Sequence, residues 1–268
     1  MSITTQKFGT LEYLTADGIA VPHCFTTRLG GVSKGIWESM NIGLHRGDDP
    51  ENVRKNYEIL GGCIGFTTDD LVLTRQTHSD IVRRVGRADC AGIDHRQYPE
   101  CDALITNEPG VTLVVFTADC TPILLHDPVT GAVGAVHAGW RGTAAGIVKK
   151  CVEKMVSEYG CDPADICAAI GPNIGQCCFE TDTDVPEALL TALGSEMKEF
   201  IEFYGDTGKY HVDLKEANAM WLRRAGVRNI EISISCTACR PDRYWSHRVV
   251  GNDRGSQGAI IVCKGAAG

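Results

Sequence analysis

The stretch from residue 113 to residue 141 constrains the fold more than any other part of the chain. It contains two short apolar runs, 113–116 (LVVF) and 132–136 (AVGAV), which are rich in valine and predict buried β-strands. Each run is followed by a side chain that can bind a metal ion or take part in catalysis, Cys120 after the first and His137 after the second. Because sites often assemble in the loops at strand ends, these two side chains are the first candidates for a functional site.

A third apolar run, 71–74, leads in the same way to His78. We predict that His78, Cys120 and His137 converge on one metal ion. Two imidazoles and one thiolate match the ligand softness of zinc, and three protein ligands leave a coordination position open, as in catalytic zinc sites. The spacing matches no short zinc motif, so convergence depends on the fold. The alternative is that the two histidines only bond to the backbone and that Cys120 only packs.

The composition bears on the class of protein. Hydrophobic residues make up 43% and charged residues 22% of the 268 residues, as in globular domains with an ample core. With 26 basic and 34 acidic residues the net charge is −8, which argues against a nucleic-acid surface. The sequence shows neither an apolar run of the roughly 18 residues that span a bilayer nor a signal-peptide pattern. We therefore expect a cytoplasmic protein that binds neither nucleic acid nor membranes.

The order of strand and helix patterns predicts an α/β (α+β) fold, a single domain of mixed β-sheets packed with helices over residues 1–268. Residues 1–27 predict a short strand pair. Asp49-Pro50-Glu51 opens a helix, which we expect to end at Gly61-Gly62. The polar residues 83–102 predict an irregular surface excursion.

Residues 147–159 predict a helix, because their apolar side chains recur at three- and four-residue spacing and Gly160 closes the pattern. We expect its N-terminus near Gly142-Thr143, directly after His137. The free N–H groups and the dipole at such a terminus favour an anion, and Arg141 lies beside them. This makes Arg141 a candidate phosphate ligand.

Thirteen cysteines, an odd number in a long chain, indicate reduced thiols rather than a disulfide scaffold. Cys236-x-x-Cys239 has the spacing of a metal or redox motif, but no second CxxC and no thioredoxin-like context accompanies it. Cys177-Cys178 adds no further signal. We expect all four to be ordinary reduced cysteines.

Other possible site residues have weaker support. The glycine-rich loop at 28–35 does not match the phosphate-loop pattern GxxxxGK[ST]. Four more histidines have no supporting motif, and we expect them to be surface or structural residues, with His45 the first exception because of its glycine-rich neighbourhood: His45, His95, His126 and His211.

Several motifs in order along the chain resemble those of one known family. They are TRLGGVS at 27–33, SMNIGLH at 39–45, GDDP at 47–50, QTHS at 76–79, DALIT at 102–106, TADC at 117–120, HAGWRG at 137–142, IGP at 170–172, CFE at 178–180 and CT at 236–237. The sequence resembles the laccase-domain family, historically labelled multicopper polyphenol oxidases and now described as purine nucleoside phosphorylases. The chain departs from the family pattern at SHRV, 246–249, where the family usually has SYRR, and at Asn56-Tyr57, where it has an arginine.

The resemblance implies a single α/β domain with Zn²⁺ at His78, Cys120 and His137. It implies phosphorolysis of adenosine, inosine and methylthioadenosine, with adenosine deamination as a companion activity. Purine nucleosides and phosphate are then the small-molecule partners, and the protein is a monomer or a small homo-oligomer. The departures affect the choice of substrate-contacting arginines and leave the metal triad unchanged.

For phosphorolysis we expect the phosphate to bind Arg141 at the helix N-terminus, with Arg46 and Arg28 from the N-terminal loops. Asn41, in one of the matching blocks, is a further candidate for substrate or phosphate binding. Zinc would stabilise charge on the leaving base in phosphorolysis, or activate water for deamination. Asp119 is a candidate to orient a ligand or carry a proton, or else only to cap a turn.

Three other functions remain open. Cys120 activated by His137 would make a metal-free cysteine hydrolase or deamidase. Copper-dependent oxidation of phenols is less favoured, because eight scattered histidines without a His-x-His pair do not suit a multicopper site. A structural zinc clamp in a binding protein would need a fourth side-chain ligand.

Overall fold

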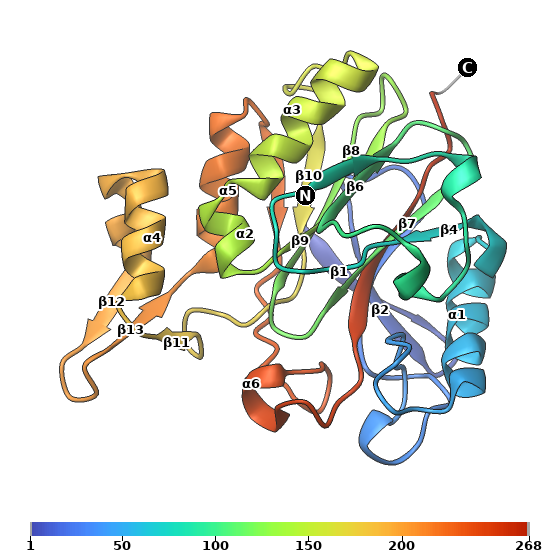
Figure 1. Cartoon of the computed structure of the whole chain (residues 1–268), viewed down its shortest axis with the longest axis horizontal. Helices are drawn as coiled ribbons and strands as arrows, with labels where there is room; N and C mark the ends of the chain where they lie inside the picture. The colour runs from blue at the N-terminus through green and yellow to red at the C-terminus, as the bar shows by residue number, and fades with distance from the viewer. Residues whose placement is uncertain (1, 267–268) are drawn as a thin grey trace.

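Two six-stranded β-sheets pack against each other and form the frame of residues 2–266, which are the residues that the computed structural model describes (Figure 1). The first sheet joins the two ends of the chain, because its C-terminal strand pairs with an N-terminal strand and with a strand from the middle. Its pairs are antiparallel except for the last. In order across the sheet the strands are β1 (Ile3–Phe8), β2 (Leu11–Ala16), β3 (His23–Thr26), β15 (Gln257–Val262), β7 (Thr112–Thr117) and β4 (Leu71–Leu73).

The second sheet is also mixed. Its outermost pair on each side is parallel and its inner pairs are antiparallel. In order across the sheet the strands are β14 (Asn229–Ile232), β10 (Cys167–Ile170), β8 (Thr121–His126), β9 (Val133–Ala138), β6 (Ala103–Thr106) and β5 (Val82–Arg84).

Strands β8 and β9 are buried on both faces, which explains their apolar sequences. Successive side chains of a strand point to opposite faces. Leu124 therefore packs in the core between the two sheets, whereas Ile123 and Leu125 pack toward the helices on the other side. A slip of one residue would exchange these two sets, so the register is fixed and the loops at the strand ends have a rigid support.

Helices cover the sheets from outside. The apolar stripe of α1 (Pro50–Ile64) joins the core of the first sheet, and α3 (Ile147–Tyr159) and α5 (Leu214–Arg224) pack on the second (Figure 1). A small antiparallel sheet and α4 enclose a third apolar cluster with α5. The remaining elements are α2 (Trp140–Ala144), α4 (Asp184–Leu193), α6 (His247–Val250), β11 (Glu180–Thr181), β12 (Ile201–Tyr204), β13 (Lys209–Val212), η1 (Gly35–Trp37), η2 (Thr68–Asp70), η3 (Arg87–Asp89), η4 (His95–Gln97) and η5 (Ser195–Phe200).

The N-terminal half differs from the expectation in detail. Residues 1–27 were expected to form a strand pair, and the described part forms three strands, β1 to β3. The helix that Asp49 caps continues past Gly61-Gly62 and ends at Gly65, whose φ of 92° is left-handed. Gly61 serves a close approach instead, because a Cβ there would lie 2.4 Å from the carbonyl oxygen of Phe66.

The middle of the chain also differs. Residues 83–102 include part of β5 together with η3 and η4, and their last residue, Asp102, is fully buried rather than on the surface. The helix expected to begin near Gly142 is divided into α2 and α3, which Gly146 separates with a left-handed φ of 73°. Strand β8 was not expected, because Pro122 near its start weakens the strand pattern.

The predicted fold class, an α/β (α+β) arrangement of mixed sheets packed with helices, is confirmed. Within residues 2–266, no helix combines the length and the apolar character needed to cross a membrane.

Candidate metal centre and its cavity

His78, Cys120 and His137, which the sequence predicts to converge, lie together with one donor atom from each within 4.8 Å of the others. His78 follows β4 of the first sheet, and Cys120 lies where the chain passes from β7 of the first sheet to β8 of the second. His137 is near the end of β9. The Sγ atom of Cys120 is 3.8 Å from Nε2 of His78, and the two imidazole rings are 5.0 Å apart between centroids. The contact between the two sheets thus brings the three side chains together.

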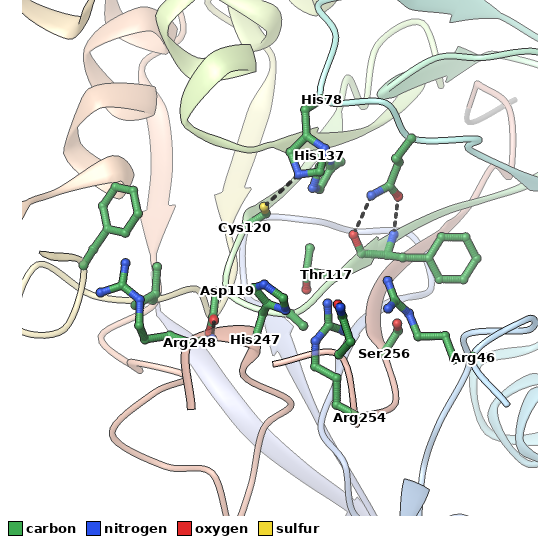
Figure 2. Close-up of a pocket in the computed structure, with 16 residues that line it drawn as sticks. Arg46, His78, Thr117, Asp119, Cys120, His137, His247, Arg248, Arg254 and Ser256 are labelled. Atoms are coloured by element: carbon green, nitrogen blue, oxygen red, sulfur yellow. Dashed lines mark hydrogen bonds between the residues drawn. The ribbon is translucent and has the colours of Figure 1, made fainter. Parts of the chain in front are cut away.

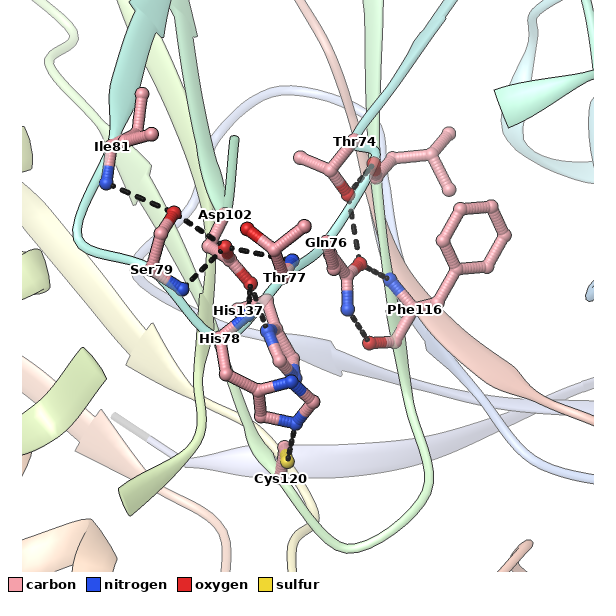
Figure 3. A network of polar contacts seen from close by, with 11 residues as sticks. Thr74, Gln76, Thr77, His78, Ser79, Ile81, Asp102, Phe116, Cys120 and His137 are labelled. Atoms are coloured by element: carbon pink, nitrogen blue, oxygen red, sulfur yellow. Dashed lines mark hydrogen bonds and ion pairs between the residues drawn. The ribbon is translucent and has the colours of Figure 1, made fainter. Parts of the chain in front are cut away.

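Asp102, directly before β6, holds this group in place (Figure 3). Its Oδ1 atom accepts hydrogen bonds from Nδ1 of His137 at 2.7 Å and from the backbone N–H of His78 at 3.1 Å. Its Oδ2 atom accepts from the backbone N–H groups of Thr77 and Ser79 and from the Ser79 hydroxyl. Because the carboxylate engages Nδ1 of His137, the other ring nitrogen remains free to bind a ligand.

Cys120, His137 and Asp102 stabilise one another's charged forms. Burial raises the pKa of the Cys120 thiol, but His137 and His78 outweigh burial and bring this pKa down to about 6. Burial lowers the pKa of His137, but Cys120 and Asp102 outweigh it and raise the pKa to about 9. Burial raises the pKa of Asp102, while His137 and Ser79 lower it to about 2. Without a metal, Cys120 and His137 therefore form a thiolate–imidazolium pair.

The backbone around the group is strained. Among the described residues, three that are not glycine have a positive φ, namely His45 (66°), His78 (60°) and Asp119 (88°). Such conformations cost free energy and concentrate at functional sites. Gly139 permits a close approach at the same place, because a Cβ there would lie 2.8 Å from Cδ2 of His78. Two of the three strained residues and this glycine thus adjoin Cys120.

The group opens onto a cavity of about 410 Å³ that contains several arginines (Figure 2). In this view Arg46 and Arg254 lie across the cavity from His78 and His137, and Arg248 lies near Asp119. Arg254 is only 7% exposed, and its Nε atom has no hydrogen-bond partner among residues 2–266. Burial and the charge of Arg46 lower its pKa to about 10, so it is still charged at neutral pH. A buried, charged guanidinium with an unpaired N–H group has a donor available to an anion.

Asp119 is an anchor for the C-terminal segment. Its Oδ1 atom accepts a hydrogen bond from the Thr237 hydroxyl at 2.6 Å, and its Oδ2 atom accepts from the Ser246 hydroxyl and from the backbone N–H of Arg248. All of these donors come from residues 237–248, and the carboxylate is buried. The carboxylate thus ties this segment to the residue that precedes Cys120.

The residues predicted to bind phosphate divide into two groups. Arg46 lines the cavity. The other three are not among its lining residues. Arg141 is exposed, with its guanidinium 4.2 Å from the ring centre of Trp140. Asn41 is buried and bonded to Asp48, Gly43 and Ser256, and Arg28 bonds to the carbonyl oxygens of Glu38 and Pro241.

A second cavity of about 590 Å³ adjoins the first and shares Arg46 with it. His45 lines it and pairs with Asp94 at 2.7 Å. His95, which was expected to be only a surface or structural residue, is half-buried beside them, and the three form another potential metal-binding group.

The sequence did not identify Asp102 and Arg254 as site residues. Asp102 had one usable signal, since it is a single acidic residue directly before an apolar run, 103–106. Arg254 lies in the glycine-rich segment 251–258, where no local pattern indicates burial.

A family model described as "Multi-copper polyphenol oxidoreductase laccase" matches residues 22–264. The chain belongs to this laccase family. "Purine nucleoside phosphorylase YlmD" of Geobacillus stearothermophilus is 39% identical over 243 residues, which are 88% of this chain and 87% of that protein. "Purine nucleoside phosphorylase" of Bacteroides thetaiotaomicron is 37% identical over 86% of this chain and 87% of its own length. "Adenosine deaminase RL5", from an unknown prokaryote, is 37% identical over 90% of this chain and 94% of its own length.

Solved structures agree with this membership of the laccase family. The crystal structure of YlmD from Geobacillus stearothermophilus superposes with a TM-score of 0.90 at 36% identity, and the match covers 97% of this chain and 98% of that one. The structure of the Bacillus licheniformis protein YfiH gives a TM-score of 0.86 at 34% identity, covering 90% and 92% of the two chains. The resemblance that the motifs indicated is thereby confirmed.

Proposed function

We propose that the chain is a zinc-dependent purine nucleoside phosphorylase that acts on adenosine, inosine and methylthioadenosine, with adenosine deamination as a companion activity. The observation that carries the proposal is the group of His78, Cys120 and His137, which opens onto a cavity with the buried Arg254. The names of the relatives, which include both activities, agree with it. The proposal treats residues 1–268 as one cytoplasmic domain, a monomer or small homo-oligomer.

The donor set fits zinc. Two imidazoles and one thiolate are preferred zinc ligands, and a group of three that faces a cavity has the form of a catalytic rather than a structural site. A bound zinc ion would supply Lewis acidity beside the substrate. Asp102 keeps Nδ1 of His137 occupied, so that its Nε2 is the nitrogen available to the metal. Copper is the less favoured metal, because a multicopper centre needs several histidine clusters.

Phosphorolysis requires phosphate and ribose to meet in this cavity. An oxygen of phosphate bonds to the anomeric carbon as the C–N bond to the purine breaks, and the bonding electron pair leaves with the purine. Arg254 and Arg46 would hold the phosphate by charge-assisted hydrogen bonds. Phe116 and Phe179 give the cavity apolar surface for a purine ring. Asp119 would act by positioning the segment that carries Arg248.

The test combines metal analysis of the purified protein with incubation in inosine and phosphate. We expect zinc to co-purify, and hypoxanthine to appear only when phosphate is present. Cys120→Ala should lose both the hypoxanthine and the metal of this group. A Cys120→Ala protein that keeps full nucleoside activity would refute the proposal.

The thiolate–imidazolium pair supports a second candidate, in which Cys120 is a nucleophile and His137 its acid–base partner in a hydrolase or deamidase. Alkylation separates the two candidates. A bare thiolate with a pKa of about 6 reacts quickly with iodoacetamide at neutral pH, whereas a zinc-bound thiolate is protected until a chelator removes the metal.

A further inference from the structure

Four other cysteines, Cys177, Cys178, Cys236 and Cys239, gather at a separate place, with all four sulfur atoms within 4.8 Å of one another. The Sγ atom of Cys239 is 3.6 Å from that of Cys177 and 3.4 Å from that of Cys178. A disulfide would bring two sulfurs to about 2.05 Å. Four thiolates around zinc, each at about 2.3 Å, stand about 3.8 Å apart at the corners of a tetrahedron. The spacing of the sulfurs is therefore close to that of a tetrathiolate zinc site.

We propose that these four cysteines hold a structural zinc ion, distinct from the one proposed at His78, Cys120 and His137. Four thiolates complete the tetrahedron and leave no position for water or substrate, which is the form of structural rather than catalytic zinc sites. The ligands form two pairs in the sequence, an adjacent pair at 177 and 178 and a C-x-x-C pair at 236 and 239. Only the fold brings the two pairs together.

The groups around the four cysteines can stabilise negatively charged sulfur. The backbone N–H of Gly175 donates to Sγ of Cys236 at 3.2 Å. A Cβ at residue 175 would lie 3.2 Å from Cβ of Cys236, which is tight, so glycine eases this close approach. Lys215, only 6% exposed, donates from Nζ to the carbonyl oxygen of Ser235 at 2.8 Å, beside Cys236. A zinc ion with four thiolates carries a net charge of −2, and a buried ammonium next to it offsets part of that charge.

The position of the cluster indicates a structural role for the ion, which would link two segments of the chain. It joins the loop before the small sheet to the C-terminal segment, which also pair through the backbone N–H of Thr237 and the carbonyl oxygen of Asn173. The carbonyl oxygen of Cys178 accepts a hydrogen bond from Arg248 at 2.9 Å, and the Thr237 hydroxyl donates to Asp119. Arg248 and Asp119 both line the cavity, so zinc at the four cysteines would fix one wall of it.

The test measures zinc in the Cys120→Ala protein, in which the zinc ligand set facing the cavity is incomplete. We expect about one zinc ion per chain to remain, with an X-ray absorption spectrum that shows a shell of four sulfurs at about 2.3 Å. In the cobalt-substituted protein we expect the intense near-ultraviolet absorption of thiolate-bound cobalt. A Cys120→Ala chain without zinc, or with a nitrogen and oxygen shell, would overturn the inference, as would disulfides among the four cysteines in mass spectra of the unreduced protein.

A matched pair of variants locates the ion. In the Cys120→Ala background, Cys239→Ser removes an exposed ligand and should lower zinc affinity at least tenfold, whereas Cys167→Ser removes a half-buried thiol outside the cluster and should leave the zinc in place. Equal zinc in both variants would overturn the inference. Hypoxanthine formation, measured separately with Cys120 intact, reports on the proposed function, so each proposal can fail without the other.

Discussion

Asp102 reaches both histidines of the candidate metal group from outside the ligand set. It bonds Nδ1 of His137 directly and holds His78 through the backbone of residues 77–79. We expect Asp102→Asn to lower zinc affinity 10- to 100-fold, because the amide no longer fixes the charge and the tautomer of His137. It should also destabilise the fold by about 3–5 kcal/mol, since a partner of a buried charge is lost.

The control for Asp102→Asn is Asp127→Asn. Asp127 is equally buried, but it bonds Val129 and Thr130 in the turn after β8. This variant should lose stability with no change in zinc affinity. Competition with a chelator gives the affinity, and urea unfolding gives the stability. Equal zinc affinities for the two variants would show that Asp102 does not act on the metal group.

Metal binding at Cys120 and His137 should release protons in a way that depends on pH. With pKa values of about 6 and about 9, the metal-free pair at pH 7.5 holds a thiolate and an imidazolium. Zinc requires the thiolate and a neutral imidazole, so binding there should release about one proton, from His137. The number should rise below pH 6, where Cys120 is protonated as well, and fall toward zero above pH 9. Calorimetry in buffers of different ionisation enthalpy measures this number, and a flat profile would contradict the assigned pKa values.

At the scale of the elements, two adjacent glycines in α1 should respond oppositely to alanine. A Cβ at Gly61 would lie 2.4 Å from a backbone oxygen, so Gly61→Ala must shift the end of the helix and should destabilise the fold by about 1–3 kcal/mol. Gly62 has open space around its Cβ position, so Gly62→Ala should stabilise the fold by about 0.5–1 kcal/mol. Thermal unfolding of both variants measures the difference. Equal shifts would mean that the close approach at Gly61 is absent in solution.

The same glycines show how far the sequence predicts the elements. The start of α1 was predictable, because Asp49 and Pro50 act locally as cap and first residue. The end of α1 was not predictable, because Gly61 looks like a helix-terminating glycine in the sequence. Its actual role is to make room for the backbone oxygen of Phe66, which only the packing brings close. Strand β9 was predictable from its apolar run, since both of its faces are buried.

The residues of the candidate site also divide into those that the sequence predicts and those that only the fold reveals. His78, Cys120 and His137 were predictable as a group, because each lies next to a predicted strand end and metal ligands are limited to few residue types. Arg254 was not, because a buried arginine is recognisable only from the surface that covers it. The four-cysteine cluster was missed for a related reason, since its two pairs are about 60 residues apart and only the fold completes the set.

At the scale of the whole molecule, the cavity is assembled from distant parts of the chain. Arg46 comes from the N-terminal loops and Phe116 from β7. Cys120 comes from the passage between β7 and β8, and Arg254 from the segment just before β15, the C-terminal strand of the first sheet. A ligand that bridges these parts binds only the folded chain. It should therefore stabilise the whole molecule by mass action.

Phosphate at 100 times its Kd should accordingly add about 2.7 kcal/mol and raise Tm by on the order of 5–10 °C in a single transition. Arg254→Met should abolish this shift, because it removes the buried charge and keeps a long apolar side chain in its place. Arg141→Met should retain the shift, because Arg141 is stacked on Trp140 outside the cavity lining. The two arginines mark the two alternative anion sites. If Arg141→Met abolished the shift and Arg254→Met retained it, phosphate would bind at the start of α2, as the sequence alone predicts. Calorimetric scans of both variants, with and without phosphate, decide between them.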